Sequence, residues 1–93
     1  MSEFSTKIVN KIIEEQEAII GPLAWEEAQK VSGLKIDVAR HAVNVEGNTR
    51  EVLERLVSQY EKLFGQASVE VCRDAVRPLL SQLKDEEIPA VLR

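Results

Sequence analysis

Aromatic residues, cysteine and histidine are all scarce in this chain of 93 residues. Only 4% of the residues are aromatic, and the sequence holds one cysteine and one histidine. A surface that stacks the bases of single-stranded nucleic acid needs several exposed rings, so the composition argues against that class of protein. A lone cysteine allows no internal disulfide, which is consistent with a reducing compartment.

Long apolar runs are also missing. The longest uncharged apolar run covers residues 18–25 and is interrupted by Gly21-Pro22, whereas a membrane-spanning helix needs about twenty apolar residues. The first residues contain no apolar stretch of the length found in signal peptides. We therefore expect a cytoplasmic protein that does not associate with membranes.

Neither half of the chain carries excess positive charge. The formal net charge is −4, with five Lys and Arg against eight Asp and Glu in residues 1–46, and seven against eight in residues 47–93. Binding along nucleic-acid phosphates or on an anionic membrane is therefore disfavoured. At 44% hydrophobic and 30% charged residues, the composition is that of a folded protein. The length suffices for one hydrophobic core, so we predict a single domain over residues 1–93.

Aliphatic residues at helical spacing are what the sequence has in abundance. In residues 5–20 apolar side chains recur at intervals of three and four, which predicts an amphipathic helix. Gln16 lies on the apolar stripe, where we expect it to hydrogen-bond or to lie at the rim. Gly21-Pro22 then ends or sharply kinks this helix, because glycine tolerates the left-handed cap and proline suits the first turn of the next helix. A shorter helix follows from Pro22 to Val31.

Two further helices are predicted in the second half of the chain. Asn48 suits the N-cap of a long amphipathic helix that Gly65 ends. Ser68 can cap a fourth helix. Pro78 lies inside that helix and lacks a backbone donor, so we expect a kink near Arg77.

The segment between the two helix pairs admits two interpretations. In residues 34–46 hydrophobic residues alternate with polar ones, as in two short strands, but several also share one face of a helix. Ala39–Ala42 contains no Gly, Asn or Pro for a tight turn, which counts against a hairpin. The β-branched content favours strands, and we favour a short β-hairpin.

The two helix pairs resemble each other. Residues 11–31 align with residues 55–75 at an offset of 44, which pairs Gly21 with Gly65 and matches apolar positions along both helices. One helical hairpin cannot bury its apolar face alone, whereas two copies can cover each other. We predict a mainly all-α fold, a four-helix bundle from two duplicated helix–Gly–helix hairpins. The expected parts are repeat 1 (about residues 5–32), a crossover with the β-hairpin (33–47), repeat 2 (about 48–84) and a C-terminal tail (85–93).

The first joint resembles a known type. The run Ile20-Gly21-Pro22-Leu23-Ala24 is similar to the Gly-Pro-x-Ala joint of small helical modules attached to bacterial protein kinases and two-component regulators. The second repeat has Gly65-Gln66-Ala67-Ser68 here and departs from the pattern at the proline. The resemblance implies a signalling-associated helical module with no chemistry of its own.

Candidate catalytic and metal-binding residues are few. A Ser–His or Cys–His pair would have to use His41, which we interpret as a surface or turn residue because its neighbours form no known motif. Cys72 lies on an apolar helix face, where a thiol is inert. One histidine is too few for the di-iron site of helical bundles, and one Cys with one His cannot supply the four ligands of a structural zinc. We predict no enzyme activity, no metal and no cofactor.

These absences favour a protein-interaction module. It would bind a partner helix or a second copy through apolar surface that so short a chain leaves unburied. Trp25 is a candidate contact, because tryptophan is enriched at binding hot spots, with core packing as the other interpretation. The apolar tail offers further candidate contacts: Ile88, Val91 and Leu92.

Two other functions stay open. Residues 25–44 resemble a helix-turn-helix with a turn at Gly33, in which Arg40 and its neighbours would face DNA. Glu26 and Asp37 would then meet phosphates unfavourably. A small-ligand sensor built on the bundle interior is the other alternative.

Overall fold

The protein is mainly helical, with one small antiparallel sheet, as the sequence predicts. The computed structural model describes residues 3–93, with side chains from Ser5 onward. The helices are α1 (Glu3–Ile20), α2 (Leu23–Ala28), α3 (Thr49–Phe64) and α4 (Gln66–Val76), and the strands are β1 (Leu34–Asp37) and β2 (Ala42–Val45). The chain after α4 forms 3₁₀ segments at Arg77–Gln82, Asp85–Glu87 and Ala90–Leu92.

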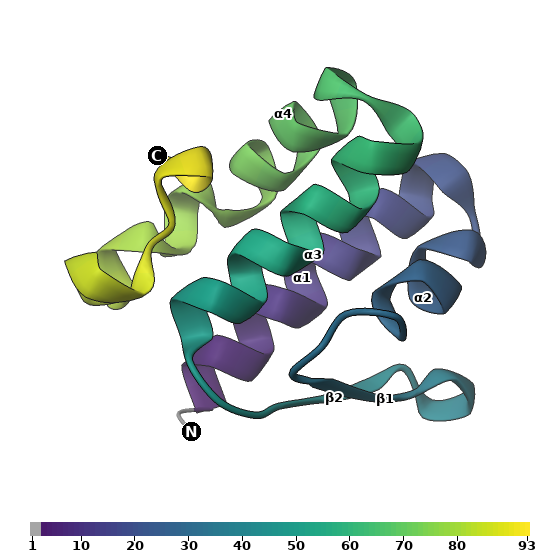
Figure 1. The fold of residues 1–93 in the computed structure, drawn as a ribbon, viewed down its shortest axis with the longest axis horizontal. Helices are drawn as coiled ribbons and strands as arrows, with labels where there is room; N and C mark the ends of the chain where they lie inside the picture. Colours follow the sequence, from purple (N-terminus) through teal and green to yellow (C-terminus); the bar gives the residue numbers. More distant parts are fainter. Residues whose placement is uncertain (1–2) are drawn as a thin grey trace.

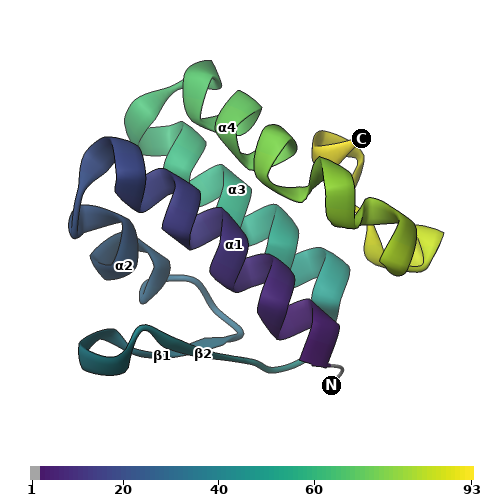
Figure 2. The ribbon, with the colours of Figure 1, turned by 180° about the vertical axis from the view of Figure 1, so that it is seen from behind.

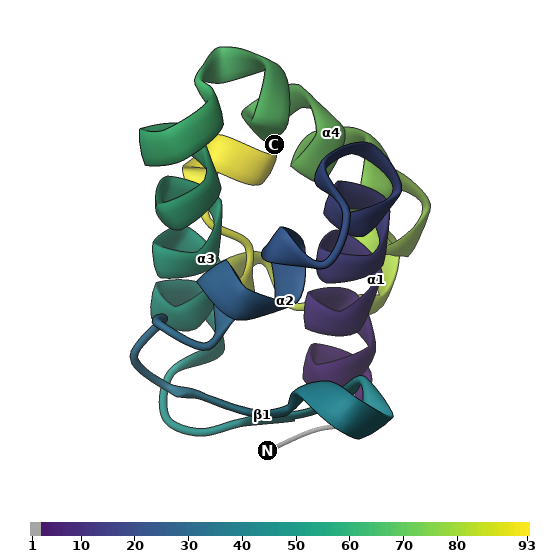
Figure 3. The same ribbon diagram turned by 90° about the vertical axis from the view of Figure 1, so that its right-hand side faces the viewer.

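The two long helices, α1 and α3, run in the same direction and finish at the same end of the molecule (Figures 1 and 2). α4 runs back along one side of this pair and packs against both helices, whereas α2 and the β-hairpin lie on the opposite side (Figure 3). The turns that join α1 to α2 and α3 to α4 therefore lie together. We call this region, residues 15–27 and 61–71, the joint end.

The core lies between these elements and is almost entirely aliphatic. In α1 and α3 apolar residues recur at intervals of three and four residues, so that each helix has one continuous apolar stripe. Burial of this stripe in the core stabilises the helix. Asn48 caps α3 as predicted, since its Oδ1 accepts a hydrogen bond from the Glu51 amide at 3.0 Å. The fully buried residues of the two stripes are Ile8, Val9, Ile12, Ile13, Val52, Leu53, Leu56 and Val57.

Buried side-chain hydrogen bonds cross this core. Gln16 Nε2 in α1 donates to the Ser68 carbonyl at the start of α4 (2.9 Å), and the Tyr60 hydroxyl in α3 donates to the Ala24 carbonyl at the start of α2 (2.7 Å). At the other end of the long helices, the hydroxyls of Ser5 and Thr49 lie 3.1 Å apart. The prediction that Gln16 satisfies its amide by hydrogen bonding is therefore confirmed.

Residues 34–45 form the β-hairpin that the sequence favoured. β1 and β2 pair in antiparallel register, with Leu34 opposite Val45. The strands are joined by a 3₁₀ turn, which does not need the Gly, Asn or Pro of a tight hairpin turn. The Asp37 carboxylate accepts a hydrogen bond from the Arg40 amide at 3.3 Å, and His41 follows in the left-handed region of backbone conformation (φ 50°). Because these residues are strands, the helix-turn-helix alternative for residues 25–44 lacks its second helix and is wrong on this point.

Two helix boundaries differ from the prediction. α2 ends at Ala28 and not at Val31, because the following amides bond three residues back, Lys30 to Glu27 and Val31 to Ala28, in tight turns that lead into the hairpin. α4 ends at Val76 and continues as 3₁₀ turns, which places the break where Pro78 removes a donor.

The start of α4 also differs. The helix begins at Gln66, and the Ser68 hydroxyl donates to the Gly65 carbonyl at 2.9 Å instead of capping the helix.

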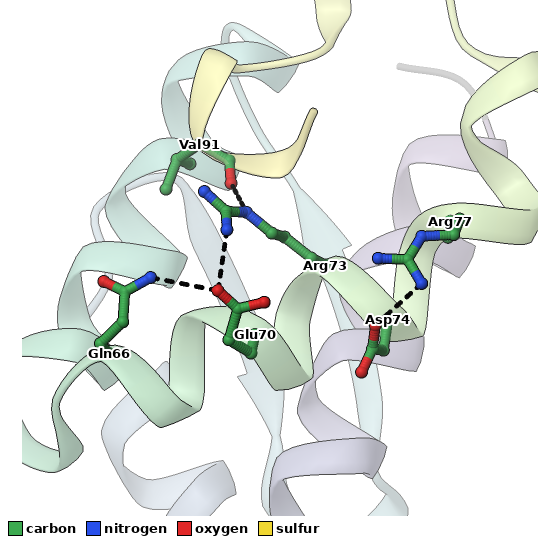
Figure 4. Close-up of polar contacts among 6 residues, drawn as sticks. All are labelled: Gln66, Glu70, Arg73, Asp74, Arg77 and Val91. Carbon is green, nitrogen blue, oxygen red and sulfur yellow. Dashed lines mark hydrogen bonds and ion pairs between the residues drawn. The ribbon is translucent and has the colours of Figure 1, made fainter.

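The C-terminal tail packs on its own chain. Ile88 and Leu92 are buried, and the last 3₁₀ segment lies against α4. Arg73 fastens this segment, since its Nε donates to the Val91 carbonyl at 2.8 Å while its Nη1 lies 2.9 Å from Glu70 (Figure 4). The tail is therefore packed against its own chain, and Ile88 and Leu92 are not exposed for contact with a partner.

Leu92→Ala should lower the free energy of unfolding by about 2–5 kcal/mol, because it leaves a cavity under the tail. Leu63→Ala is the matched control: Leu63 is 48% exposed, and its truncation should cost about 1 kcal/mol or less. Urea unfolding followed by the fluorescence of the single tryptophan compares the two. Equal losses would contradict the packing of the tail.

Tyr60→Phe should weaken the fold by about 1–2 kcal/mol at neutral pH, because the Ala24 carbonyl loses its buried donor. Burial raises the pKa of Tyr60, and burial also raises the pKa of Cys72 to about 11. Both groups therefore hold their protons more tightly in the folded state than in the unfolded state. The free energy of unfolding then falls as the pH rises above the pKa values of the unfolded chain, which are about 8.5 for Cys and about 10 for Tyr.

The phenylalanine variant lacks the tyrosine part of this alkaline loss. The difference in free energy of unfolding between the wild type and Tyr60→Phe, measured by urea unfolding, should therefore become smaller between about pH 9 and pH 11. A deficit that stays constant over this range would show that Tyr60 ionises as easily in the folded state as in the unfolded one.

Candidate functional site

Apolar side chains are exposed at the joint end. Ile19 in the last turn of α1 is 64% exposed, Leu63 in the last turn of α3 is 48% exposed, and Leu23 at the start of α2 is 39% exposed. These are the large hydrophobic residues that are exposed in the described part of the chain. Single exposed aliphatic residues are ordinary, but their collection at one end marks a candidate interaction surface.

The exposure has a simple structural cause. Ile19 and Leu63 continue the buried stripes of α1 and α3, three residues beyond Gln16 and Tyr60 respectively. Both residues lie in the last turn of their helix, just before the chain turns into α2 or α4, and there the stripe is no longer covered. The sequence therefore supplies core-type side chains where no element of the described chain covers them.

A groove that Ile19 helps to line lies between α1 and α4. Its volume is about 260 Å³, which is below the roughly 300–1,000 Å³ typical of small-molecule pockets. The size suits the side chains of a partner better than a free ligand. The lining residues that carry the apolar surface are Ile19, Ile20, Phe64, Ala67 and Val71.

The charges at the joint end are mostly negative. Residues 15–27 and 61–71 contain six glutamates and one lysine, Lys62. Glu15 and Glu70 pair with Lys11 and Arg73 of their own helices, at 3.6 and 2.9 Å. Glu26 and Glu61 are exposed and make no ion pair within residues 5–93.

Glu27 belongs to a separate polar network between α2 and α3. It accepts hydrogen bonds from Lys30 Nζ (3.0 Å) and Gln59 Nε2 (2.8 Å), and these bonds lower its pKa. A larger and shallower hollow of about 540 Å³ adjoins this network, lined by polar residues that include Arg55 and Lys62. Its cations are exposed surface residues and form no enclosed anion site.

Most of the contact residues predicted from the sequence lie in the core. Trp25 is 1% exposed, Ile88 is 7% exposed and Leu92 is 2% exposed, whereas Val91 is half-buried. The contact surface expected from these four residues is therefore corrected: the core-packing interpretation of Trp25 holds, and the tail covers its own chain. The residues that the sequence analysis missed, Ile19 and Leu63, carried a signal, because both apolar stripes continue to the last helical turn.

His41 covers one face of Trp25. The two rings stack with centroids 4.3 Å apart and an interplanar angle of 10°, and His41 Nε2 lies 3.8 Å from the Glu17 carboxylate. The hairpin turn, where His41 takes a left-handed conformation, therefore places this ring over α2. His41 is an exposed turn residue, as predicted, with a packing role that spacing in the sequence did not reveal.

Cys72 and His41, the two residues considered above for catalysis, lie in different surroundings, because Cys72 is in the core and His41 is exposed at the hairpin turn. Cys72 is fully buried and accepts a hydrogen bond from Gln16 Nε2 at 3.3 Å, and its raised pKa keeps the thiol protonated near neutral pH. Among the described residues, no group of three or more His, Cys, Asp or Glu side chains is placed to hold a metal ion.

Comparison with protein-family models, with curated proteins and with solved structures gives no match. In the described part of the chain, no helix combines the length and the apolar character needed to cross a membrane.

His41→Ala should shift the fluorescence of the single tryptophan to longer wavelength, because water gains access to the ring face that His41 covers. Loss of the stacked pair should cost about 0.5–1.5 kcal/mol of stability. Arg40→Ala is the control in the neighbouring residue, which forms only an exposed ion pair with Asp37. An unchanged emission spectrum for His41→Ala would contradict the stacking.

Proposed function

We propose that this protein is a non-enzymatic protein-interaction module whose contact surface is the joint end. The observation that carries the proposal is the exposure of Ile19, Leu23 and Leu63 at the joint end, where Ile19 also lines the groove between α1 and α4. Removing such a patch from water is the main favourable term in most protein associations. The buried thiol of Cys72 and the packing role of His41 support a function without catalysis.

We also propose that the two helix pairs are duplicated copies of one hairpin. The hydrogen bonds across the core support this, because Gln16 corresponds to Tyr60 and Ala24 to Ser68 at the offset of 44. The bond from residue 16 to residue 68 is thus repeated as the bond from residue 60 to residue 24. Ser5 and Thr49, which contact each other, are themselves 44 apart.

The burial pattern agrees with the same correspondence. Ile19 and Leu63 are both exposed, and their preceding stripe residues are both buried. The joint glycines Gly21 and Gly65 share a positive φ, 72° and 78°. A duplicated hairpin accounts for the joint end as well, since two equivalent helix ends then lie side by side.

The duplicated helical hairpins and the Gly-Pro-x-Ala run are consistent with a signalling-associated module. The function requires either a protein partner or a second copy of this chain at the joint end. A DNA-binding role has no recognition helix in residues 34–45, and a ligand sensor has no observation in its favour.

A photo-reactive p-benzoylphenylalanine in place of Leu63 should crosslink to another protein, or to a second copy, in cells that produce this protein. The same residue in place of Arg50, at the opposite end of α3, is the control and should give little crosslinking. Gel analysis and mass spectrometry read the products. Equal or absent crosslinking at the two positions would contradict the proposed contact surface.

A further inference from the structure

The partner's chemistry follows from the charges around the apolar surface. An apolar patch at an interface excludes water whatever its partner, but the rim decides which partners are tolerated. The joint end is acidic: Glu26 in α2 and Glu61 in α3 are exposed there and make no ion pair in the described chain, and we call these two residues the acidic rim of the joint end, although neither lines the groove itself. A cationic partner is attracted to these carboxylates, and an acidic partner is repelled by them.

A second copy of this chain is a poor occupant by this criterion. Bringing two joint ends together would place two acidic rims face to face, with Lys62 as the only cation that each contributes from this region. Like charges placed opposite each other at an interface cost several kcal/mol. Dimerisation through this surface is therefore opposed by the rim that surrounds it.

The shape of the surface identifies the form of the partner. The groove lies between two neighbouring antiparallel helices, α1 and α4, and its apolar lining comes from Ile19, Ile20, Ala67 and Val71, together with Phe64. At about 260 Å³ it holds one or two aliphatic side chains. An amphipathic helix lying across a groove presents such anchors on one face at intervals of three and four residues.

We propose that the joint end binds a basic amphipathic helix of a partner protein. Aliphatic residues on one face of that helix fill the groove between α1 and α4, and flanking Lys or Arg side chains meet Glu26 and Glu61. This inference rests on the proposed interaction function and adds the class of partner. It also predicts that association weakens as salt screens the rim.

The probe is a fluorescent leucine–lysine amphipathic peptide of about four helical turns, measured by anisotropy against the full chain. It should bind the wild type, and raising salt from about 0.05 to about 0.5 M should weaken binding. A leucine–glutamate peptide of the same pattern should not bind. An alanine–lysine peptide, which keeps the charge but lacks the anchors, should bind at least about tenfold more weakly.

Matched variants separate the apolar and the charged parts. Ile19→Ser should weaken binding of the leucine–lysine peptide about tenfold or more, whereas Val43→Ser on the hairpin should leave it within about twofold. Glu61→Gln should weaken binding at low salt only, and Glu51→Gln, at the opposite end of α3, should not. Trp25 fluorescence verifies that each variant is folded.

Several outcomes would overturn the inference. Equal binding to Ile19→Ser and wild type would show charge attraction without a groove, and binding of the leucine–glutamate peptide would show that the rim does not select. Crosslinking of residue 63 to a second copy would assign the surface to self-association. If the leucine–lysine peptide does not bind but residue 63 crosslinks to another protein, the inference of a basic helix is wrong and the proposed interaction function is retained. If the peptide does not bind and residue 63 gives no crosslink, both proposals are wrong.

Discussion

The hydrogen bond from Tyr60 to the Ala24 carbonyl, together with its counterpart from Gln16 to the Ser68 carbonyl, holds the two helix pairs in register. Aliphatic packing alone is non-directional and tolerates sliding of one helix along another. A buried polar group that loses its partner costs far more than a shifted methyl group, so these two bonds specify one arrangement. Because each starts in a long helix of one pair and ends at the short helix of the other, they also fix both joints at the same end.

The position of the exposed apolar residues follows from this register. Both long helices end at the joint, and in the last turn of each one residue of the apolar stripe, Ile19 or Leu63, is exposed. The same arrangement brings glutamates of all four helices to the joint end. A modest net charge of −4 for the whole chain thus becomes an acidic rim at one end, which composition by itself cannot reveal.

Much of the fold could be predicted from periodicity, and the failures have physical causes. The stripes of α1 and α3, the glycine joints and the hairpin follow from local pattern, and the kink near Arg77 follows from the chemistry of Pro78. The buried tail could not be predicted, because Ile88 and Leu92 look the same in sequence whether they cover their own chain or another. The candidate site was missed for a related reason: Ile19 and Leu63 have the spacing of core residues, and the sequence pattern does not show where along each stripe the cover from other elements ends.

The parallel course of α1 and α3 has an electrical consequence. Peptide dipoles along a helix sum to roughly half a charge at each terminus, negative at the C-terminal end. The C-termini of α1 and α3 both lie at the joint end, but the N-termini of α2 and α4 lie there too and carry partial charge of the opposite sign, so the helix dipoles largely cancel at this end. The net negative charge of the joint end therefore comes from its glutamate side chains and not from the backbone.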